Sequence, residues 1–324
     1  MVDADVSWQI GSTAVHGTLV RPEGLGPFPG VVMVAGSGPT DRDWNSPLLP
    51  GTNGSARLLA GALARAGIAS LRYDKRGTGP GGPATLQAMM GRVSMQSFAD
   101  EVAGAAQTLA AQDFVRRDRI FGLGNSEGTL HVLNHQVGAP EIPFAGLVLA
   151  APPGRPVGAV ARMQLAEQAA ALPNGDALLT VYDAAIARFT AGEPTAPDPA
   201  LPQGVQDLLH SLEHPANLPF ARELWLADGA ALLPRVDVPV LVIIGKRDIQ
   251  VDWQADGEPL QRAAAGRANV TFRFPEHANH ILKHEPRERS QLAAAEVQAG
   301  YNAAGAGLDP EAEADIVEWI QAHV

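Results

Sequence analysis

Ser126 lies in a short segment, residues 124–128, that follows the pattern G-x-S-x-G. This pattern is typical of a sharp strand-to-helix turn that holds the serine hydroxyl out at the edge of a sheet. A serine held in this way acts as a nucleophile when a neighbouring base accepts its proton. Because so short a match also arises by chance, the surrounding sequence has to support it.

The residues on either side of Ser126 fit a strand and a helix. Residues 119–123 form a short apolar run of the length expected for a buried strand. Residues 128–135 have the composition of a helix. The order of strand, serine turn and helix is the one that the pattern requires.

A serine nucleophile needs a histidine base and an acid that orients the histidine, in the chain order Ser, Asp or Glu, His. Asp248 directly follows the strongly apolar residues 238–245, and His280 follows the next expected strand, residues 269–274. The carboxyl ends of parallel strands meet at one edge of a sheet. We therefore expect Asp248 and His280 to lie beside Ser126.

Other residues of the same two loops compete for these roles. His277 and His284 are alternative bases, but His280 stands where the polar loop turns into the following segment, so we favour it. Asp252 is an alternative acid. Asp248 is closer to the end of the strand, so we assign Asp252 to the surface.

Acyl transfer to serine also needs hydrogen-bond donors for the oxyanion that develops. The backbone N–H of Glu127, the residue after the nucleophile, is one candidate. The loop after the apolar residues 30–35 contains two glycines that let the backbone approach a substrate closely, so the N–H of Ser37 is the second candidate. This loop lacks the Lys-Ser/Thr ending of a P-loop, which argues against nucleotide binding.

Strand and helix patterns alternate along most of the chain and have to position these loops. Strands are expected at residues 6–10, 13–20, 30–35, 68–73, 119–123, 145–151, 238–245 and 269–274, and helices at 56–66, 97–111, 128–135 and 315–323. The first two strands are expected to form an antiparallel pair. The alternation predicts an α/β fold, with a mainly parallel sheet covered by helices on both faces.

Residues 154–235 interrupt this alternation, because their sequence is typical of helices, with no clear strand, and contains a proline-rich stretch at 193–199. We expect a core built from residues 1–153 and 236–324, with residues 154–235 forming a helical cap over the strand ends. A peripheral helical subdomain that only adds stability is the alternative. The apolar residues here that belong to a cap core or line an acyl pocket are Met163, Leu165, Phe189, Leu208, Leu212, Phe220, Leu224 and Trp225.

The composition limits the classes of function. The net charge of −11 and the pI near 5.2 argue against a nucleic-acid or anionic-membrane surface. The absence of cysteine excludes disulfides and thiolate metal sites. The first residues lack the apolar segment of a signal peptide, and no apolar run approaches the ~20 residues of a membrane span, so we expect a cytoplasmic location. Homo-oligomer formation is left open by the sequence.

The chain resembles the α/β-hydrolases, and among them the bacterial carboxylesterases that carry a Gly-Ser-Gly-Pro-x-Asp-Arg-Asp loop. The segments that carry this resemblance are residues 36–43, 73–79 and 151–156, together with the elbow at Ser126, Asp248 and His280. The resemblance implies an α/β-hydrolase fold with a helical cap, a Ser-Asp-His triad, an ester substrate and no cofactor. No metal site is expected either.

Three residues depart from the wider superfamily pattern. Histidine is common before Gly36 and at position 125, where this chain has Ala35 and Asn125, and a second glycine often stands at Thr129. These changes leave the backbone donors in place but affect the shape of the pocket. Asn125 is therefore a candidate pocket residue, as are Trp44 and Trp253, which adjoin the candidate site loops.

Two charged groups near these loops have structural interpretations. Asp74 and Arg76 are expected to pair with each other and pin the turn that contains them. Arg42 is expected to pair with Asp41 and Asp43, the acids on either side of it, and so to fix this loop; recognition of a substrate carboxylate is the alternative.

Together these observations predict a serine carboxylic-ester hydrolase that acts on a small-to-medium ester through an acyl-enzyme. The same residues would serve an amidase or peptidase, a thioesterase or acyltransferase, or a C–C bond hydrolase. A haloalkane dehalogenase is disfavoured, because its nucleophile would be an aspartate in place of Ser126. A non-catalytic binding protein on the same scaffold is the alternative from a different class.

Overall fold

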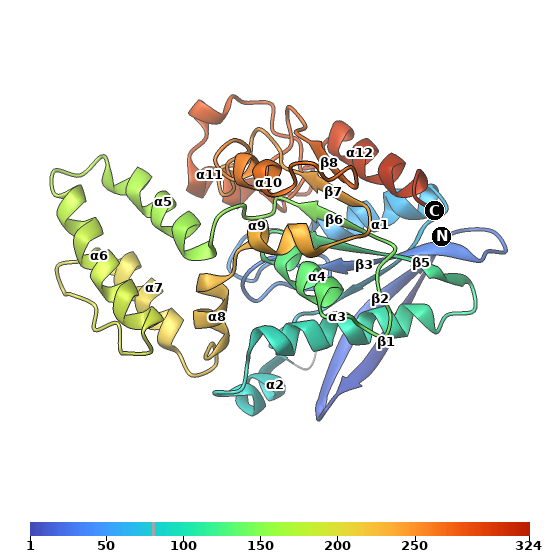
Figure 1. Ribbon diagram of the computed structural model, residues 1–324, viewed down its shortest axis with the longest axis horizontal. Helices are drawn as coiled ribbons and strands as arrows, with labels where there is room; N and C mark the ends of the chain where they lie inside the picture. The colour runs from blue at the N-terminus through green and yellow to red at the C-terminus, as the bar shows by residue number, and fades with distance from the viewer. Residues whose placement is uncertain (80–81) are drawn as a thin grey trace.

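The structure is a computed structural model, and it describes residues 1–79 and 82–324. A single eight-stranded sheet, in the order β1-β2-β4-β3-β5-β6-β7-β8, forms its centre (Figure 1). The strands are β1 (Val2–Ile10), β2 (Thr13–Arg21), β3 (Phe28–Val34), β4 (Ala69–Tyr73), β5 (Val115–Asn125), β6 (Gly146–Ala150), β7 (Val240–Ile243) and β8 (Val270–Arg273). The pairs β1–β2 and β2–β4 are antiparallel and every other pair is parallel. The predicted mainly parallel sheet with an antiparallel pair at its start is confirmed.

Helices cover both faces of the sheet (Figure 1). They are α1 (Ser55–Arg65), α2 (Gly82–Met89), α3 (Met95–Ala110), α4 (Glu127–Val137), α5 (Val157–Ala169), α6 (Gly175–Thr190), α7 (Gln203–Glu213), α8 (Phe220–Leu226), α9 (Gly229–Leu232), α10 (Gly257–Ala263), α11 (Ala294–Gly300) and α12 (Pro310–Gln321), with the 3-10 turns η1 (Leu233–Arg235) and η2 (Arg289–Gln291). Helices α1 and α12 pack on one face, and α3, α4 and α10 on the other. None of the helices among the described residues has the length and apolar character needed to cross a bilayer.

The last helix starts earlier than the sequence pattern indicates. It was expected at residues 315–323, but it begins at Pro310, because the Asp309 side chain accepts a hydrogen bond from the N–H of Ala312. Proline is favoured at a first helical position, where its missing N–H has no partner to lose. The helix start is therefore set by its cap, not by the apolar pattern.

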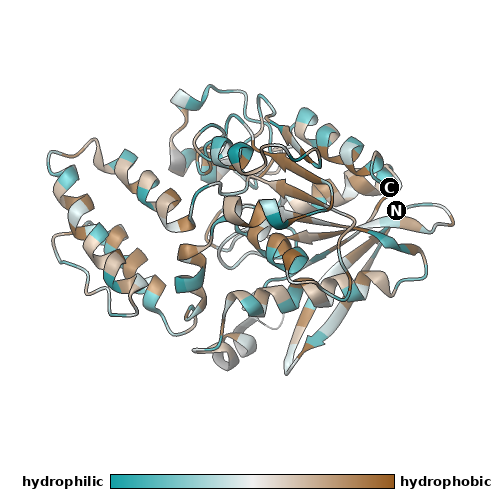
Figure 2. Ribbon diagram, viewed as in Figure 1, coloured by the Kyte–Doolittle hydropathy of each residue, from teal (hydrophilic) through white to brown (hydrophobic). Residues whose placement is uncertain are grey.

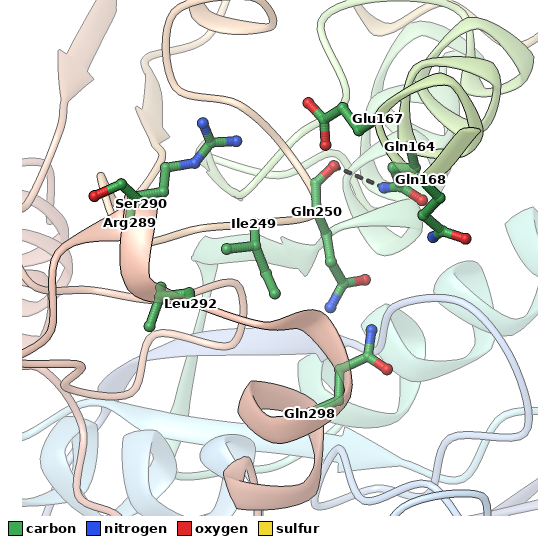
Figure 3. Close-up of a pocket in the computed structure, with 9 residues that line it drawn as sticks. All are labelled: Gln164, Glu167, Gln168, Ile249, Gln250, Arg289, Ser290, Leu292 and Gln298. Atoms are coloured by element: carbon green, nitrogen blue, oxygen red, sulfur yellow. Dashed lines mark hydrogen bonds between the residues drawn. The ribbon is translucent and has the colours of Figure 1, made fainter. Parts of the chain in front are cut away.

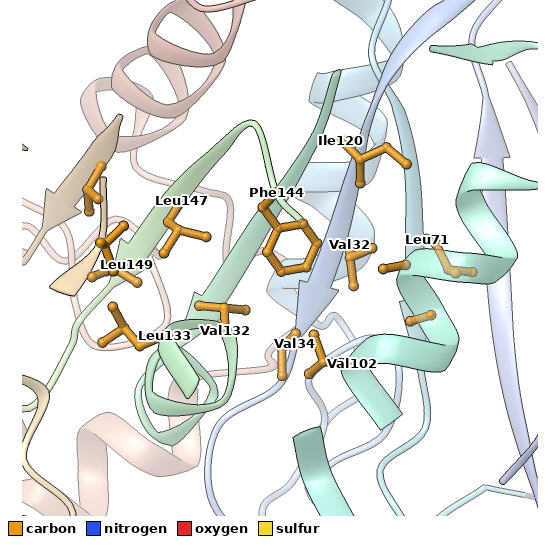
Figure 4. Close-up of a cluster of buried hydrophobic side chains, with 14 of the residues drawn as sticks. Val32, Val34, Leu71, Val102, Ile120, Val132, Leu133, Phe144, Leu147 and Leu149 are labelled. Carbon is orange, nitrogen blue, oxygen red and sulfur yellow. The ribbon is translucent and has the colours of Figure 1, made fainter. Parts of the chain in front are cut away.

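The central strands are apolar throughout because both of their faces are buried. Alternate residues of β3 point to opposite faces: Val32 and Val34 join the cluster under α3 and α4, and Val31 and Met33 join the cluster under α1 and α12. Figure 4 shows the first cluster, in which Phe144 packs beside these valines. The hydropathy colouring places the strongly apolar strands at the centre of the molecule (Figure 2). This packed core fixes the strand ends from which the site loops start.

The helices α5 to α8, which we call the inserted helices, lie between β6 and β7 in the chain and to one side of the sheet (Figure 1). They have a core of their own, formed around residues such as Tyr182, Phe189 and Trp225. Leu233 and Val236, by contrast, belong to the core of the sheet, so the chain rejoins the main body before residue 236.

An ion pair fixes the point where the inserted helices leave the sheet. The fully buried Asp256 accepts hydrogen bonds from Arg155 Nε at 2.9 Å and Arg155 Nη2 at 2.7 Å, and from the N–H of Gly154 at 3.2 Å. The Gly154 backbone lies so close that a Cβ there would come within 1.8 Å of the Asp256 carbonyl oxygen. Residue 154 therefore has to be glycine for this junction to form.

Candidate active site

Ser126 occupies the turn between β5 and α4, as the pattern predicts. Its backbone has φ 53° and ψ −122°, a conformation that costs a non-glycine residue of order 1–3 kcal/mol. A Cβ at Gly124 would lie 2.4 Å from the Gly128 carbonyl carbon, and one at Gly128 would lie 2.5 Å from the Val34 carbonyl oxygen. Both glycines are therefore required by close backbone packing around the serine.

Two of the residues that depart from the superfamily pattern help to hold this turn. Thr129 Oγ1 donates a hydrogen bond to the Ser126 carbonyl oxygen at 2.6 Å. Asn125 Nδ2 donates to the His280 carbonyl oxygen at 3.0 Å. Asn125 thus connects the serine turn directly to the loop that carries the candidate base.

Asp248 and His280 lie side by side, as predicted from their places after β7 and β8. His280 Nδ1 is 2.8 Å from Asp248 Oδ2, and Asp248 is fully buried. The other carboxylate oxygen, Oδ1, accepts hydrogen bonds from the N–H groups of Gln250 at 2.7 Å and Val251 at 2.9 Å. An ionised carboxylate only accepts, so His280 Nδ1 carries the proton and Nε2 is left as the acceptor.

The rival residues lie elsewhere. His284 Nδ1 contacts Asp309 Oδ2 at 3.0 Å, and the His277 ring lies 5.2 Å from the His284 ring between centroids, with 57° between the ring planes. The expectation that Asp252 is a surface carboxylate is wrong, because its side chain is only 16% exposed. It pairs with Arg289 at 2.8 Å and accepts hydrogen bonds from backbone N–H groups at the following turn.

Ser126 and His280 line a common cavity of about 170 Å³. Its other lining residues are Ser37, Glu127, Pro153, Val157, Val160, Ala161, Gln164, Gln250 and Val251. Within the described part of the chain, no hydrogen bond joins the Ser126 hydroxyl to the His280 ring. Such contacts commonly tighten only when substrate is bound.

The two candidate oxyanion donors border this same cavity. Ser37 follows β3 and Glu127 begins α4, and both residues line the wall beside Ser126. Neither backbone N–H donates to a protein acceptor among the described residues. A Cβ at Gly36 would contact Ser126 Cβ at 3.2 Å, so this loop packs directly on the serine turn. Both N–H groups are therefore free to bind a negatively charged oxygen.

The candidate pocket residues Asn125, Trp44 and Trp253 are absent from the described lining of this cavity. Trp44 is buried in the core under α1, and Trp253 packs on Phe274 at 5.6 Å between ring centroids. Proximity in sequence to a site loop did not place either indole at the site.

Two larger cavities adjoin the first one. One, of about 500 Å³, is lined by Gln164, Gln168, Gln250 and Gln298 together with Glu167 and Arg289 and by apolar side chains such as Ile249 and Leu292 (Figure 3). Gln164 Nε2 donates to the Gln250 carbonyl oxygen at 2.9 Å, as the dashed line in Figure 3 marks. Gln164 and Gln250 also line the cavity that contains Ser126. Local sequence gave no signal for either glutamine, because contacts between α5 and the loop after β7 create their role.

The second larger cavity lies among the inserted helices and is mainly apolar. It measures about 500 Å³, and its walls include Leu165, Leu178, Val205 and Trp225. It shares Ala161 and Gln164 with the cavity that contains Ser126. Of the expected acyl-pocket residues, Leu165, Leu208 and Trp225 line it.

A buried ion pair lies behind the serine turn. Lys75 Nζ is 2.7 Å from Glu127 Oε1, and His131 Nε2 is 3.0 Å from the same oxygen. Burial on its own would raise the pKa of the Glu127 carboxyl, but the Lys75 charge and the His131 hydrogen bond outweigh it, so this pKa lies well below its ordinary value. Burial lowers the pKa of the His131 imidazole, which is therefore neutral and donates from Nε2. The sequence pattern did not identify Lys75 as a site residue. The one signal for it was its place in the segment 73–79, which carries part of the family resemblance.

Ion pairs with other elements hold the loop that contains Ser37. Arg42 Nη2 is 2.7 Å from Asp74 Oδ2, and Arg42 Nη1 is 2.9 Å from Asp5 Oδ1. Asp43 Oδ1 is 2.7 Å from Arg72 Nε. The expectation that Arg42 pairs with its neighbouring acids is wrong, because residues 41–44 form a turn in which the Asp41 carboxylate accepts from the N–H groups of Asp43 and Asn45, while Arg42 and Asp43 reach other elements.

The expected pair between Asp74 and Arg76 is also wrong, because each residue has a partner on another element. Asp74 binds Arg42, and Arg76 Nε donates to Glu101 of α3. Burial raises the pKa of the fully buried Glu101 carboxyl to about 7, although the Arg76 charge opposes this shift. The turn is held by the contact of Asp74 with Arg42 and by that of Arg76 with Glu101, and not by a pair between Asp74 and Arg76.

The residues that the structure describes include no cluster of three or more His, Cys, Asp or Glu side chains that could hold a metal ion.

Comparisons with known proteins identify the family of the chain. The sequence model of the Alpha/beta hydrolase family matches residues 31–295. Esterase EstD of Thermotoga maritima is 28% identical over 278 residues, an alignment that covers 82% of this chain and 57% of EstD. The chain thus spans little more than half the length of this relative.

Solved structures share the fold. Proline iminopeptidase of Mycobacterium smegmatis has a TM-score of 0.57 and 17% identity, with 99% of this chain and 98% of that one covered. An esterase from Thermogutta terrifontis has a TM-score of 0.53 and 18% identity, with coverage of 100% and 99%. The family match extends over most of the chain, and the sheet order and the serine turn fit it. The chain belongs to the Alpha/beta hydrolase family.

Proposed function

We propose that the protein is a serine carboxylesterase that uses Ser126, His280 and Asp248 as a catalytic triad. The observation that carries the proposal is the 2.8 Å contact between His280 Nδ1 and the buried Asp248, with His280 and Ser126 on one cavity. The contact leaves His280 Nε2 as the acceptor for the serine proton. The free N–H groups of Ser37 and Glu127 supply the oxyanion site.

The proposed reaction has two halves. Ser126 Oγ attacks the ester carbonyl carbon while His280 Nε2 accepts the hydroxyl proton, and the oxygen that becomes negative binds the two N–H groups. The bond to the alcohol oxygen then breaks, and His280 returns the proton to that oxygen. Water, activated by His280, attacks the acyl-enzyme in the same way, which releases the carboxylic acid and restores Ser126.

An ester is favoured over a peptide substrate with a free amino terminus. Recognition of an ammonium group would need an unpaired carboxylate at the site. Glu127 is the one carboxylate among the described residues that line the cavity of Ser126, and Lys75 already neutralises it; Glu167 lines the adjoining cavity of about 500 Å³ and not this one. The name of EstD, an esterase, points in the same direction. Together with the 36–43 loop, this supports placing the chain among the bacterial carboxylesterases.

The inserted helices are proposed to act as a cap that holds the apolar part of the substrate. Helix α5 contributes Val157, Val160, Ala161 and Gln164 to the wall of the small cavity. The apolar cavity beyond Ala161 and Gln164 is large enough for a short or medium acyl chain. A panel of p-nitrophenyl esters from acetyl to dodecanoyl measures the chain length that it accepts.

The test of the proposal is Ser126→Ala. Hydrolysis of p-nitrophenyl acetate should fall by at least about 10³-fold, and the thermal unfolding curve should remain cooperative. A fluorophosphonate probe should label the native protein and not this variant. Undiminished ester hydrolysis by the alanine variant would rule out the proposed nucleophile. Faster turnover of amides or thioesters than of matched esters would instead favour an amidase or a thioesterase on the same triad.

A further inference from the structure

Lys75 contacts Gly36 and Glu127, the residues next to and at the two proposed oxyanion donors. Its ammonium group donates to the Gly36 carbonyl oxygen at 2.8 Å and contacts Glu127 Oε1 at 2.7 Å. The side chains of Lys75 and Glu127 are 5% and 3% exposed, so water does not weaken these contacts. The Lys75 ammonium also lies 5.0 Å from the centre of the Phe98 ring.

The contact with Gly36 acts on one oxyanion donor. The Gly36 carbonyl and the Ser37 N–H belong to the same planar peptide group, and they point in opposite directions. A hydrogen bond to the oxygen therefore fixes the direction of the N–H. Hydrogen bonds in a chain also polarise one another, so a cation at the oxygen strengthens the N–H as a donor.

The contact with Glu127 acts on the other donor. Glu127 supplies its own backbone N–H, and its side chain is held from two sides by Lys75 and by His131. The His131 ring stacks on Phe98 at 4.7 Å between centroids, with 15° between the ring planes. The residue after the nucleophile therefore cannot turn without breaking a buried ion pair.

We propose that Lys75 and Glu127 form a positioning pair that holds both oxyanion donors, the N–H groups of Ser37 and Glu127, at a fixed separation. This inference rests on the proposed esterase function. Stability alone is a poor reason to retain the pair, because the loss of hydration on burial offsets most of the attraction between such charges. The pair is also neutral as a unit, so it orients the donors without placing a net charge beside the oxyanion.

The test replaces the pair with uncharged side chains of similar size, Lys75→Met with Glu127→Gln, which leaves both backbone N–H groups present. We expect kcat for p-nitrophenyl acetate to fall roughly 10- to 100-fold, less than complete loss of a donor, while KM changes less than about threefold. A trifluoromethyl ketone, which binds as a hemiketal oxyanion on Ser126, should lose affinity by the same factor as kcat. The single variant Lys75→Arg keeps Glu127 and a charged donor, so its kcat and its ketone affinity should lie between those of the native protein and those of the double variant.

The adjacent residue offers a matched control. Arg76 and Glu101 form a second buried pair, which touches neither donor. The variant Arg76→Met with Glu101→Gln should change stability while kcat and the trifluoromethyl ketone affinity stay within about twofold of the native values.

The outcomes separate the two proposals. If the native protein hydrolyses no ester and binds no trifluoromethyl ketone, the proposed function fails. If the native protein is active but the Lys75–Glu127 variant keeps its kcat, or loses kcat without losing ketone affinity, the positioning role is overturned. If the double variant does not fold, Glu127→Gln alone decides. Its amide oxygen can still accept from Lys75, but the loss of the carboxylate charge weakens that contact, so kcat and ketone affinity should still fall together.

Discussion

The sheet body and the inserted helices are held together in different ways. Around the serine turn, charged side chains are buried in pairs, such as Lys75 with Glu127. In the inserted helices, the Arg162–Asp183 pair is exposed to 47% and 41%, and Leu172 and Leu208 are exposed at the apolar cavity. Donors that must be placed to a fraction of an ångström need such fixed partners, whereas a wall that only excludes water does not. We therefore propose that the reaction belongs to the body and substrate selection to the inserted helices.

The largest expected effect is in the body. Asp248→Asn leaves the shape of the acid nearly unchanged but removes the charge that keeps His280 Nδ1 protonated. We expect kcat to fall about 10⁴-fold, because the wrong imidazole tautomer is then favoured. Stopped-flow measurement with p-nitrophenyl acetate, with circular dichroism to verify folding, tests this. A fall of less than tenfold in a folded variant would mean that Asp248 does not orient the base.

An intermediate effect is expected in the inserted helices. Gly204 lines the apolar cavity, and a Cβ there would meet no atom within 4 Å, so Gly204→Phe can fill the cavity without a backbone clash. The kcat/KM for decanoate esters should fall roughly tenfold, while that for acetate esters stays within about twofold.

Gly305 provides the control for this substitution, because it also has no atom within 4 Å of a Cβ and it lines none of the described cavities. Gly305→Phe should leave the chain-length profile unchanged. Equal losses for acetate and decanoate in the Gly204 variant would contradict the assignment of selection to the inserted helices.

A smaller effect concerns the pH dependence of stability within the body. The pKa of Glu101 rises on folding from 4.5 to about 7, so its contribution to stability is fully present below about pH 4.5 and is lost as the pH rises through about 7. The pKa of Glu127 is lowered, so its contribution is present above about pH 4.5 and is lost as the pH falls. In urea unfolding, Glu101→Gln should gain stability relative to the native protein between pH 4.5 and 8. Parallel curves for the two proteins would show that Glu101 does not take up a proton on folding.

The smallest effect is expected at the exposed pair of the inserted helices. Arg162→Ala should leave the rate of ester hydrolysis unchanged and shift the melting temperature only slightly, because exposed ion pairs contribute little. Differential scanning calorimetry beside an activity assay measures both. A large loss of activity would show that α5 is held in place from its outer side.

Local patterns were sufficient for the features that depend on nearby residues. The strand before Ser126, the glycines around it and the loops of Asp248 and His280 follow from apolar runs and turn residues. The ion pairs were not predictable in this way, because Arg42 and Asp74 are 32 residues apart and Lys75 and Glu127 are 52 apart. Trp44 failed as a pocket residue because a loop next to a site can still direct a large side chain into the core.

The inserted helices are attached to the body at two places: at the Arg155–Asp256 junction before α5, and at α8, where the Phe220 N–H donates to the Val93 carbonyl oxygen at 2.8 Å. Helix α5 begins two residues after Arg155 and, with 13 residues, is about 20 Å long. A tilt of about 10° about that end would move its far end by about 3.5 Å, but Val157 and Val160 by about 1 Å or less. Gln164, seven residues after Val157 on α5, would move by about 2 Å, so the 2.9 Å hydrogen bond from its Nε2 to the Gln250 carbonyl oxygen opposes such a tilt and holds the wall beside Ser126 in place.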